Sequence, residues 1–480
     1  MSLLIDVSVG GSGPHAVQGT VFGSMAGFLS DSVQEVKVLL ADSDTDGKML
    51  ADAKATYRNA YGVYAEAPDA DRHEHLLRTR ILDPNPMEFN PIPDLDKLTL
   101  AKLLDLEMER DARSGVADLV DVLFTTQEQD SQLDDGFVGR PNIGAMYMSE
   151  HIDFGAGVWK DFFSHVRGVL EGQDVHIVLK GSTSGGMGTS GLPRIAAGIK
   201  RHMAEQDMSS VPVRLAAILY MPYFSHEDAA SDGSLVSESS AFLQRAQATL
   251  MYYGRHCGEL FDAVYVLGSP NGPRYEYSTG GANPPHVVHL ASLGAVRHFV
   301  DKRNGTNPYH MLWRLDSQRV HWEDLWPDTT MRIRLGTLYR TARAYLDQIY
   351  PGVTATSKRG AAAWYQQFLR RTAPFEQYEP IYLIIRECFE RYVTWMDDIN
   401  SKSGDDVRLV RPGAEFERLI QPYKAEETDE VRRALSIQHV MTRLVRKATR
   451  REASRAGKGA DAIYKFVGFL YDECALDITA

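Results

Sequence analysis

The chain has 480 residues, of which 44% are hydrophobic and 24% are charged. This length and composition are those of a globular protein that buries a large core, and we expect two domains. The formal net charge of −12 argues against a general nucleic-acid-binding protein.

The first predicted strand, Leu3–Val9, leads into a glycine loop and a helix over His15–Leu29. The turn between them is Gly10-Gly11-Ser12-Gly13-Pro14. The letters GSGPHA fit the degenerate G-x-G-x-x-A pattern of dinucleotide-binding loops, which is a weak match when it stands alone. The next strand, Val36–Ala41, ends in Asp42-Ser43-Asp44, and a Rossmann ribose site also has an acidic strand end. This loop alone does not separate an NAD-type fold from other nucleotide-binding folds.

A polar region follows, up to about residue 140. The proline-rich stretch Asp83–Asp94 predicts a surface insertion, and helical patterns occur around Leu98–Arg110 and Gly115–Leu123. Residues 139–144 (GRPNIG) predict a tight loop before a helix over Phe154–Leu170.

The most informative segment is Val175–Pro193, in which a β-branched strand ends in a loop of glycine, serine and threonine. The loop is predicted over Gly181–Gly191, with a helix over Leu192–Met203 directly after it. Glycine lets the backbone approach a ligand closely, and the free N–H groups at a helix start bind anions. We interpret the loop as a phosphate cradle and not as a flexible surface loop, because it lies between a buried strand and a helix. Valine at Gly186 or Gly188 should then block nucleotide binding and leave the fold largely intact.

Further strands are predicted at Val213–Tyr220 and Ala263–Gly268, with a helix over Ser237–Gly254 between them. A long helix then runs from Asn283 to about Lys302. The alternation of strands and helices predicts an α/β fold with a mostly parallel, Rossmann-like sheet and helices on both faces. Ligands of such sheets bind beyond the carboxyl ends of the strands, where all of these loops lie.

The last third of the chain is predicted to be helical, with no convincing run of strands after Arg303. Helical patterns cover Met331–Tyr350, Lys358–Arg371, Pro380–Asn400, Ala414–Leu419 and Thr428–Ala453, and their aromatic side chains are expected to form a helical core. The basic run Arg443–Lys458 is interpreted as a solvated helix face in preference to a nucleic-acid or membrane contact. We therefore divide the chain into a nucleotide-binding domain, residues 1–302, and a mainly helical domain, residues 303–480.

The cysteines and the apolar runs indicate where the protein resides. Cys257, Cys388 and Cys474 are too far apart to suggest a disulfide framework or a metal site. No run approaches the ~18 apolar residues of a membrane span, and no signal peptide is recognisable. We expect a cytoplasmic protein without a membrane span.

Taken in order, the loops resemble those of the tubulin/FtsZ superfamily of GTP-binding, filament-forming proteins. Val9–Val17 resembles the first phosphate loop of FtsZ, with His15 where that family has asparagine. Asp42-Ser43-Asp44 resembles the N-T-D after its second strand, and residues 140–144 resemble its third loop. Ser184–Ser190 (SGGMGTS) is similar to the superfamily's G-G-G-T-G-[ST]-G, with methionine in place of threonine.

The resemblance continues to about residue 330. Met221–Glu227 resembles the loop whose glutamate binds ribose, Ser269–Asn271 resembles the loop near the base, and Asn283–Val300 would be the central helix that lies against the guanine. The resemblance implies GTP or GDP as the cofactor, with Mg²⁺ bridging phosphate oxygens. The chain has no P-loop lysine, so backbone N–H groups would carry much of the phosphate site. The nucleotide-contacting residues that the resemblance implies are Gly10, Gly11, Ser12, Gly13, His15, Asp44, Asn142, Ser184, Gly185, Gly186, Met187, Gly188, Thr189, Ser190, Glu227, Asn271 and Asn283.

The superfamily's hydrolysis loop, N-x-D-x-x-D after the central helix, has no clean counterpart in this chain. The nearest candidate is Glu323 and Asp324 in the sequence HWEDL, whose carboxylates could position a water. The alternative is an acidic pair favourably placed at a helix start. In this superfamily the acidic loop acts on the nucleotide of the next subunit, so the resemblance implies head-to-tail self-association and turnover that rises with protein concentration. The lack of strands in the last third indicates a divergent bacterial tubulin-like protein.

Three hypotheses remain open. The first is an assembling GTPase whose C-terminal helices are available to a protein partner. The second is a tubulin-like protein that binds nucleotide as a structural or regulatory ligand and hydrolyses it poorly. The third is a Rossmann-type dinucleotide enzyme that uses only the first glycine loop. Copurified GTP or GDP would favour the first two, and copurified NAD(P) or FAD would favour the third.

Overall fold

The computed structural model describes residues 2–44, 47–65, 73–91, 99–130, 137, 140–150, 152–169, 173–208, 210–226, 242–269, 272–275, 282–302, 309–314, 319–355, 369–404, 406–421, 436–449 and 458–476. Its centre is a parallel β-sheet made of β1 (Ser2–Val9), β2 (Glu35–Ala41), β3 (Arg80–Ile81), β4 (Met87–Phe89), β5 (Asp174–Ser182), β6 (Val213–Tyr220), β8 (Ala263–Gly268) and β10 (Tyr309–Arg314). Neighbouring strands follow the order β10-β8-β6-β5-β1-β2-β3, and β4 also pairs with β2. Every pair in this sheet is parallel, which confirms the predicted α/β fold.

The central strands β1 and β5 are buried on both faces of the sheet. All eight residues of β1 are buried, and so is β5 from Val175 to Gly181. Such uninterrupted apolar runs are typical of parallel strands with helices on both sides. Successive side chains enter two separate cores: Leu4 and Val178 belong to one, and Ile5 and Leu179 belong to the other.

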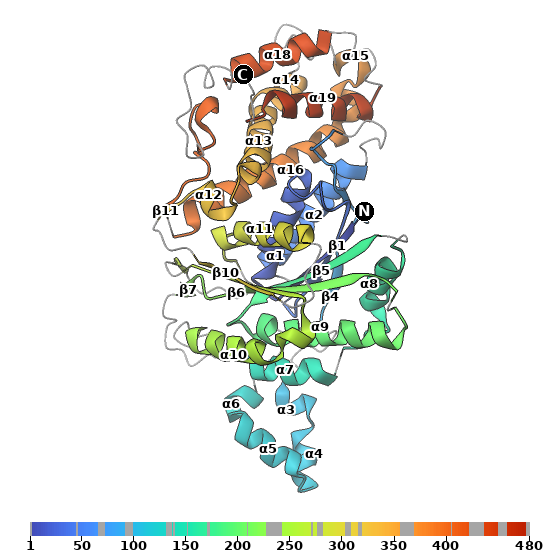
Figure 1. The fold of residues 1–480 in the computed structure, drawn as a ribbon, viewed down its shortest axis with the longest axis vertical. Helices are drawn as coiled ribbons and strands as arrows, with labels where there is room; N and C mark the ends of the chain where they lie inside the picture. The colour runs from blue at the N-terminus through green and yellow to red at the C-terminus, as the bar shows by residue number, and fades with distance from the viewer. Residues whose placement is uncertain are drawn as a thin grey trace.

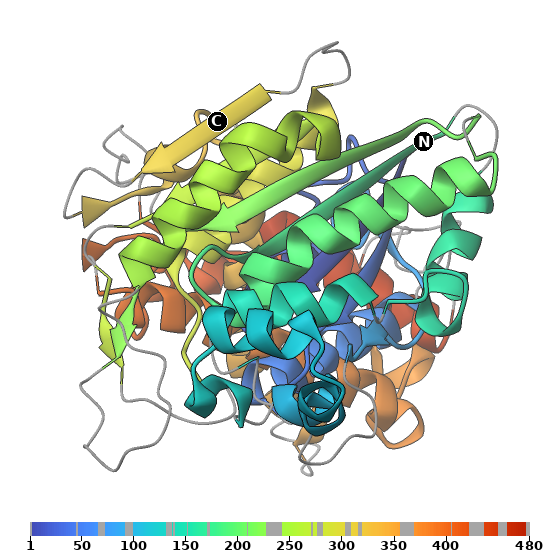
Figure 2. The same cartoon turned by 90° about the horizontal axis from the view of Figure 1, so that it is seen from below.

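Helices cover the two faces of the sheet (Figures 1 and 2). Those on one face are α1 (Gly13–Met25), α2 (Lys48–Ala65) and α11 (Val287–Asp301). Those on the other face are α8 (Gly157–Arg167), α9 (Gly186–Glu205) and α10 (Phe242–Leu260), with α7 (Pro141–Glu150) packed against α9. Helices that follow neighbouring strands to opposite faces leave a crevice at the carboxyl edge of the sheet.

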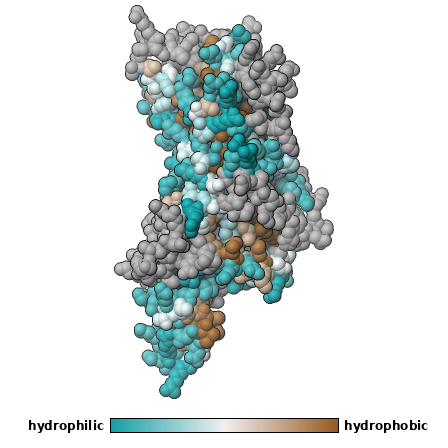
Figure 3. All heavy atoms as spheres, turned by 90° about the vertical axis from the view of Figure 1, so that its left-hand side faces the viewer, coloured by the Kyte–Doolittle hydropathy of each residue, from teal (hydrophilic) through white to brown (hydrophobic). Residues whose placement is uncertain are grey.

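A small helical projection extends beyond α7, at the lower end of Figure 1. It consists of α3 (Leu100–Leu103), α4 (Leu106–Asp111), α5 (Gly115–Leu123) and α6 (Thr126–Gln129). Ser114 and Thr125 begin α5 and α6 by accepting backbone N–H groups of the first turn, as N-cap residues do. Val116, Leu119, Val122 and Leu123 are exposed, and an apolar patch is visible on this projection in Figure 3.

The C-terminal region packs against the outer side of α1, α2 and α11 (Figure 1). Its described helices are α12 (Trp322–Leu325), α13 (Thr330–Ala344), η4 (Tyr345–Ile349), α14 (Tyr350–Thr354), α15 (Arg370–Thr372), α16 (Phe375–Lys402), η6 (Phe416–Arg418), α18 (Ile437–Thr449) and α19 (Ala460–Glu473). The Phe22 ring of α1 lies 5.0 Å from the ring of Tyr392 and 5.5 Å from that of Trp395. The prediction that the aromatic residues of this region form a helical core is therefore confirmed for the described helix α16.

The sequence predicts no convincing run of strands after Arg303, but the described residues contain three strands there, β10 and two shorter ones. β10 lies after that residue and pairs with β8, so the sheet extends beyond residue 302. Its sequence, YHMLWR, has no β-branched residue, and pairing with an established strand decides its conformation. The short strands β11 (Arg319–Val320) and β12 (Asp406–Val407) also pair with each other.

Two further predictions of local structure need correction. Within the tight loop predicted at residues 139–144, residues 141–144 instead form the start of α7, in which Pro141 takes the first helical position. The central helix begins at Val287 and not at Asn283, because His286 caps it after two prolines. Within the part of the chain that the structure describes, no helix is both long and apolar enough for a membrane crossing.

Candidate functional site

The two glycine loops meet at the point where the strand order reverses. β1 and β5 are neighbours, and the helices that follow them, α1 and α9, lie on opposite faces of the sheet. Val9 at the end of β1 is level with Ala41 of β2 and with Gly181 of β5. Ligands of open α/β sheets bind at this kind of switch point.

The first loop needs glycine for both its conformation and its packing. Gly10 has φ of +74°, a left-handed conformation, and its N–H donates to the carbonyl of Ala41 at 2.9 Å. A Cβ on Gly10 would lie 3.0 Å from the amide nitrogen of Gly188 in the second loop. At the start of α1, a Cβ on Gly13 would lie 2.1 Å from Oγ of Ser8. The two loops are therefore in direct backbone contact.

The second loop is shorter than the sequence predicts. α9 begins at Gly186 with Gly185 as its N-cap, so residues 186–191 are helical and the expected long loop was wrong. Oγ of Ser182 accepts the N–H groups of Ser184 and Gly185, at 3.1 and 3.3 Å. Helix geometry leaves the N–H groups of residues 186, 187 and 188 without intrahelical partners, and N–H groups at a helix start can bind anions.

The hydroxyl groups of the second loop are mostly used within the protein. Thr189 Oγ1 donates to the carbonyl of Ser182 at 3.2 Å, and Ser190 Oγ donates to that of Gly186 at 2.7 Å. Met187 is buried in the core that lies beneath α9. Ser184, also predicted to cradle phosphate, is buried, and its Oγ lies 3.1 Å from Oγ of Ser182. The hydroxyl groups of Thr189 and Ser190 are thus bonded within the protein, and the backbone N–H groups are the candidate anion donors of this loop.

His15 and Asn283, both predicted to contact the ligand, are held together in the structure. Nε2 of His15 donates to the backbone carbonyl of Asn283 at 2.7 Å, and Nδ1 lies 2.8 Å from Oε1 of Gln18. Burial lowers the pKa of His15, although both hydrogen bonds oppose this shift. The contact ties the first turn of α1 to the segment that precedes α11.

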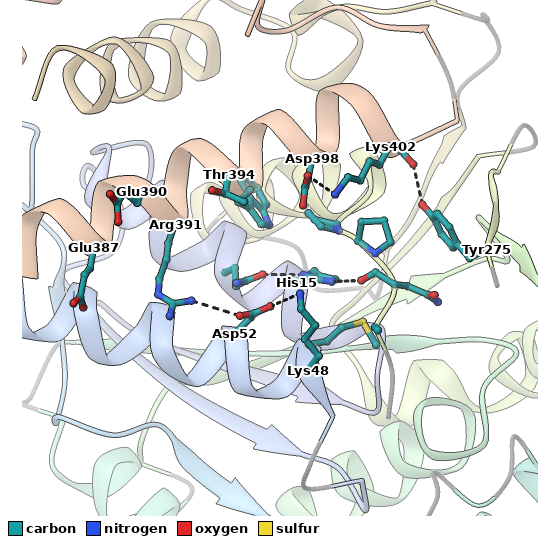
Figure 4. A pocket seen from close by; sticks show the side chains of 17 residues that line it. His15, Lys48, Asp52, Tyr275, Glu387, Glu390, Arg391, Thr394, Asp398 and Lys402 are labelled. Carbon is teal, nitrogen blue, oxygen red and sulfur yellow. Dashed lines mark hydrogen bonds and ion pairs between the residues drawn. The ribbon is translucent and has the colours of Figure 1, made fainter. Parts of the chain in front are cut away.

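A cavity of about 660 Å³ opens beside this contact, which is large enough for a nucleoside (Figure 4). Its floor consists of residues from α1, α2 and the 282–285 segment, and its roof is α16. Met49 of α2 lines it, and the Cε atom of this methionine would lie 3.4 Å from a Cβ on Gly11. The cavity thus adjoins the first glycine loop through Met49 and extends toward α16.

The cavity contains charged residues that the sequence analysis missed. Asp52 lies between two cations, with Oδ2 3.1 Å from Nζ of Lys48 and Oδ1 3.5 Å from Arg391. On α16, Asp398 Oδ1 lies 2.7 Å from Nζ of Lys402 (Figure 4). No motif marks these residues, because i,i+4 pairs of opposite charge also occur on ordinary solvated helix faces. Only the packing of α16 over α2 reveals them.

The loops after β6 and β8 also approach this cavity. The short strands β7 (Ser225–His226) and β9 (Arg274–Tyr275) pair in parallel and join the two loops. Tyr275 lines the cavity and donates to the backbone carbonyl of Lys402 at 2.9 Å. Glu227 and Asn271, the predicted sugar and base contacts on these loops, lie outside the described residues.

Asp44 and Asn142 occupy less central positions. Asp44 follows β2 at the carboxyl edge of the sheet, and its N–H donates to Oδ1 of Asp42 at 3.3 Å. Asn142 is exposed in the first turn of α7. α7 lies close to the start of α9, since a Cβ on Gly144 would be 2.4 Å from Oγ of Ser190. The structure thus places Asp44 at the same sheet edge as the glycine loops and Asn142 at the exposed start of a helix that packs against α9.

Glu323 and Asp324, the predicted hydrolytic pair, lie in the short helix α12 beside α11. Asp324 accepts the N–H of His321 at 2.8 Å and so stabilises the start of α12. One carboxylate oxygen of Glu323 is buried, and no described residue donates a hydrogen bond to it. The Trp326 ring lies 5.4 Å from Phe28, which follows the C-terminal end of α1. The pair therefore lies away from the glycine loops at the other end of α1.

Polar groups are buried beneath the site, between β1, β5 and α1. Nζ of Lys180 lies 2.7 Å from Oδ2 of Asp6 and donates to Thr20 Oγ1 at 2.7 Å, and both charged side chains are fully buried. Nearby, Nε2 of His289 lies 3.1 Å from the hydroxyl of Tyr223. These groups tie the central strands to the helices that carry the site.

Comparison with known proteins gives no family for this chain: no protein-family model matches it, and no curated protein matches its sequence. Among the described residues, no group of three or more histidine, cysteine, aspartate or glutamate side chains is arranged to hold a metal ion. The geometry of the glycine loops and of the cavity is therefore the basis for a functional assignment.

Proposed function

We propose that the protein binds a guanine nucleotide, GTP or GDP, with its phosphates at the two glycine loops and its base in the adjoining cavity. The observation that carries this proposal is the backbone contact of the two loops at the switch point of the sheet. The strand order, the two loops and the α11 helix after β8 together support a tubulin/FtsZ-like protein. The proposal places the nucleotide between the sheet and the C-terminal helices.

The chemistry of the crevice suits phosphate. The first turns of α1 and α9 direct their N–H groups and their positive dipole ends toward the same region. Mg²⁺ would be held by the phosphate oxygens and water, as this ion retains several waters and takes few protein ligands. A dinucleotide enzyme that used only the first loop would leave the N–H groups of α9 without a role, so the second loop favours the mononucleotide.

The test uses Gly185, the N-cap of α9. A Cβ at this position would meet nothing closer than Ser182 Cβ, at 3.7 Å, so a side chain fits. Aspartate is a good N-cap residue but repels phosphate. We expect Gly185→Asp to retain or slightly raise the melting temperature and to weaken GTP and GDP binding at least tenfold, as measured by calorimetric titration in the presence of Mg²⁺.

Gly185→Asn is the matched control, because asparagine has the same shape and caps equally well without the charge. It should bind GTP within about threefold of the parent. If Gly185→Asp and the parent bind equally tightly, or if the parent binds NAD in preference to GTP, the proposal is wrong. Gly188→Val, which the sequence suggested as a clean test, is unsuitable, because its Cβ would lie 2.7 Å from the Ser182 backbone nitrogen.

A second candidate function is binding of nucleotide as a structural or regulatory ligand with little hydrolysis. The engagement of Asp324 in capping α12 favours it over an assembling GTPase. We expect Asp324→Ala to lower the free energy of unfolding by about 0.5 kcal/mol and to leave phosphate release unchanged. Denaturant unfolding and phosphate release over a series of protein concentrations measure both effects.

The assembling GTPase predicts a different result in the same experiment. Because α12 lies away from the glycine loops, only another subunit could bring its carboxylates to the nucleotide. Phosphate release per subunit would then rise steeply with concentration and would fall in Asp324→Ala and Glu323→Gln, with GTP affinity kept. That outcome would support hydrolysis by Glu323 and Asp324 in a head-to-tail assembly.

A further inference from the structure

We propose that the cavity selects guanine over adenine, and that Asp398 and Lys402 of α16 recognise the Watson–Crick edge of the base. This inference rests on the proposed function. It assigns a role in base recognition to the C-terminal helices. The two residues lie one helical turn apart on the cavity wall, with Oδ1 and Nζ 2.7 Å from each other.

The end of α16 is fixed in place opposite the His15–Asn283 contact. Three hydrogen bonds anchor this helix end. The Tyr275 hydroxyl donates to the carbonyl of Lys402 at 2.9 Å. His286 Nε2 donates to the carbonyl of Ser403 at 2.7 Å, and the N–H of Val287 donates to Oγ of Ser403 at 3.0 Å. The residues of this anchor come from the loop after β8 and from the start of α11. The carboxylate and the ammonium group are therefore presented to the cavity by a rigid helix end.

The pair matches guanine in the arrangement of donors and acceptors. The guanine edge places the O6 acceptor beside the N1–H donor and the 2-amino group. A carboxylate can accept from both of these donors, and an adjacent ammonium can donate to O6. Adenine places a bare N1 in the middle of that edge, which repels a carboxylate, and its one amino group lies on the other side.

Among the other carboxylates of the cavity, both oxygens of Asp52 face cations. Glu390 and Glu387 each have one oxygen in a contact, with Arg386 at 2.7 Å and with Asn59 at 3.4 Å. Both lie farther along α16 from the His15–Asn283 contact than Asp398 does (Figure 4). Among the described residues, Asp398 has an ion pair with Lys402 only, through Oδ1, which leaves Oδ2 for a ligand. Its side chain is 24% exposed, so a base can reach it while much of the surrounding water is excluded.

The experiment measures calorimetric affinities for GTP, ATP and xanthosine triphosphate at fixed Mg²⁺. We expect the parent to bind GTP at least tenfold more tightly than ATP, since a bidentate base contact gives discrimination of this size. Asp398→Asn should weaken GTP binding at least tenfold. The same variant should strengthen xanthosine triphosphate binding, because the amide can donate to the 2-oxo group that replaces the 2-amino group.

Glu379→Gln is the matched control, since Glu379 is exposed on the same helix and does not line the cavity. It should leave all three affinities unchanged. An Asp398→Asn variant with unchanged affinity ratios would overturn the base assignment and leave the proposed function intact. Equal affinities of the parent for GTP and ATP would overturn the base assignment and reduce the proposed function to nucleotide binding without a preference for guanine. A parent that binds none of the three nucleotides would overturn both.

Discussion

Replacement of Lys180 by methionine is expected to lower the free energy of unfolding by about 3–5 kcal/mol. Lys180 and Asp6 form a fully buried ion pair at 2.7 Å between β5 and β1, and Asp6 Oδ1 has no further hydrogen-bond partner among the described residues. Burial lowers the pKa of the Lys180 ammonium, while the nearby Asp6 carboxylate opposes this shift. Methionine would leave the carboxylate buried without its cation, and an uncompensated buried charge is strongly destabilising.

Denaturant unfolding of the ligand-free protein measures this effect. Lys200→Met is the control, because Lys200 extends from α9 to the carbonyl of Glu259 at the surface, and it should cost less than about 1 kcal/mol. The double variant Lys180→Met/Asp6→Leu removes both charges and should regain much of the stability lost in the single variant. If Lys180→Met is as stable as the parent, the Lys180–Asp6 ion pair does not stabilise the fold and the prediction is wrong.

The protein is expected to lose stability as the pH falls from about 6.5 to about 4, because three buried histidines of the site are held neutral. Burial lowers the pKa of His286 from 6.5 to about 4 and also lowers the pKa of His15 and of His289. A histidine with a lower pKa in the folded state takes up a proton on unfolding. Its contribution is fully present above pH 6.5 and is lost as the pH falls through the folded pKa; for His286 it is about 3 kcal/mol.

His286→Asn separates this effect from general acid denaturation. His286 caps α11 by accepting the N–H of Val288, and asparagine is a preferred N-cap residue that does not titrate. The free energy of unfolding of this variant, measured between pH 7.5 and pH 4.5, should fall less steeply than that of the parent. His256→Asn, at an exposed position on α10, should retain the parent's pH dependence. Equal slopes in the parent and His286→Asn would contradict the prediction.

Much of the sheet could be predicted from local sequence. The predicted strands at Val213–Tyr220 and Ala263–Gly268 agree with β6 and β8 in both bounds, and Leu3–Val9 differs from β1 by one residue. These strands are largely buried on both faces, so their sequences are short, mostly apolar runs that end at or near a turn-forming glycine or proline, namely Gly10, Pro222 and Gly268. The start of α9 was misplaced, because a first turn rich in glycine has low helix propensity and is stabilised by its packing against β1 and β5.

The candidate site was only partly visible in the sequence. Glycine loops at strand ends are encoded locally, since positive φ and close backbone approach require glycine wherever the chain folds in this way. His15 and Asn283 were identified through the family resemblance, and the structure brings them into contact at 2.7 Å. Asp398 and Lys402 could not be identified, because their spacing on α16 is that of any surface ion pair.

By itself the sequence determined a parallel α/β sheet with two glycine loops at strand ends, because burial on both faces and tight turns leave periodic, local signals. Only the tertiary structure decided that β10 extends the sheet, that α16 encloses a cavity with α1 and α2, and that Lys180 meets Asp6. These features depend on contacts between residues far apart in the chain. The free energy of such contacts comes from packing and burial in the folded protein, which no local pattern of side chains records.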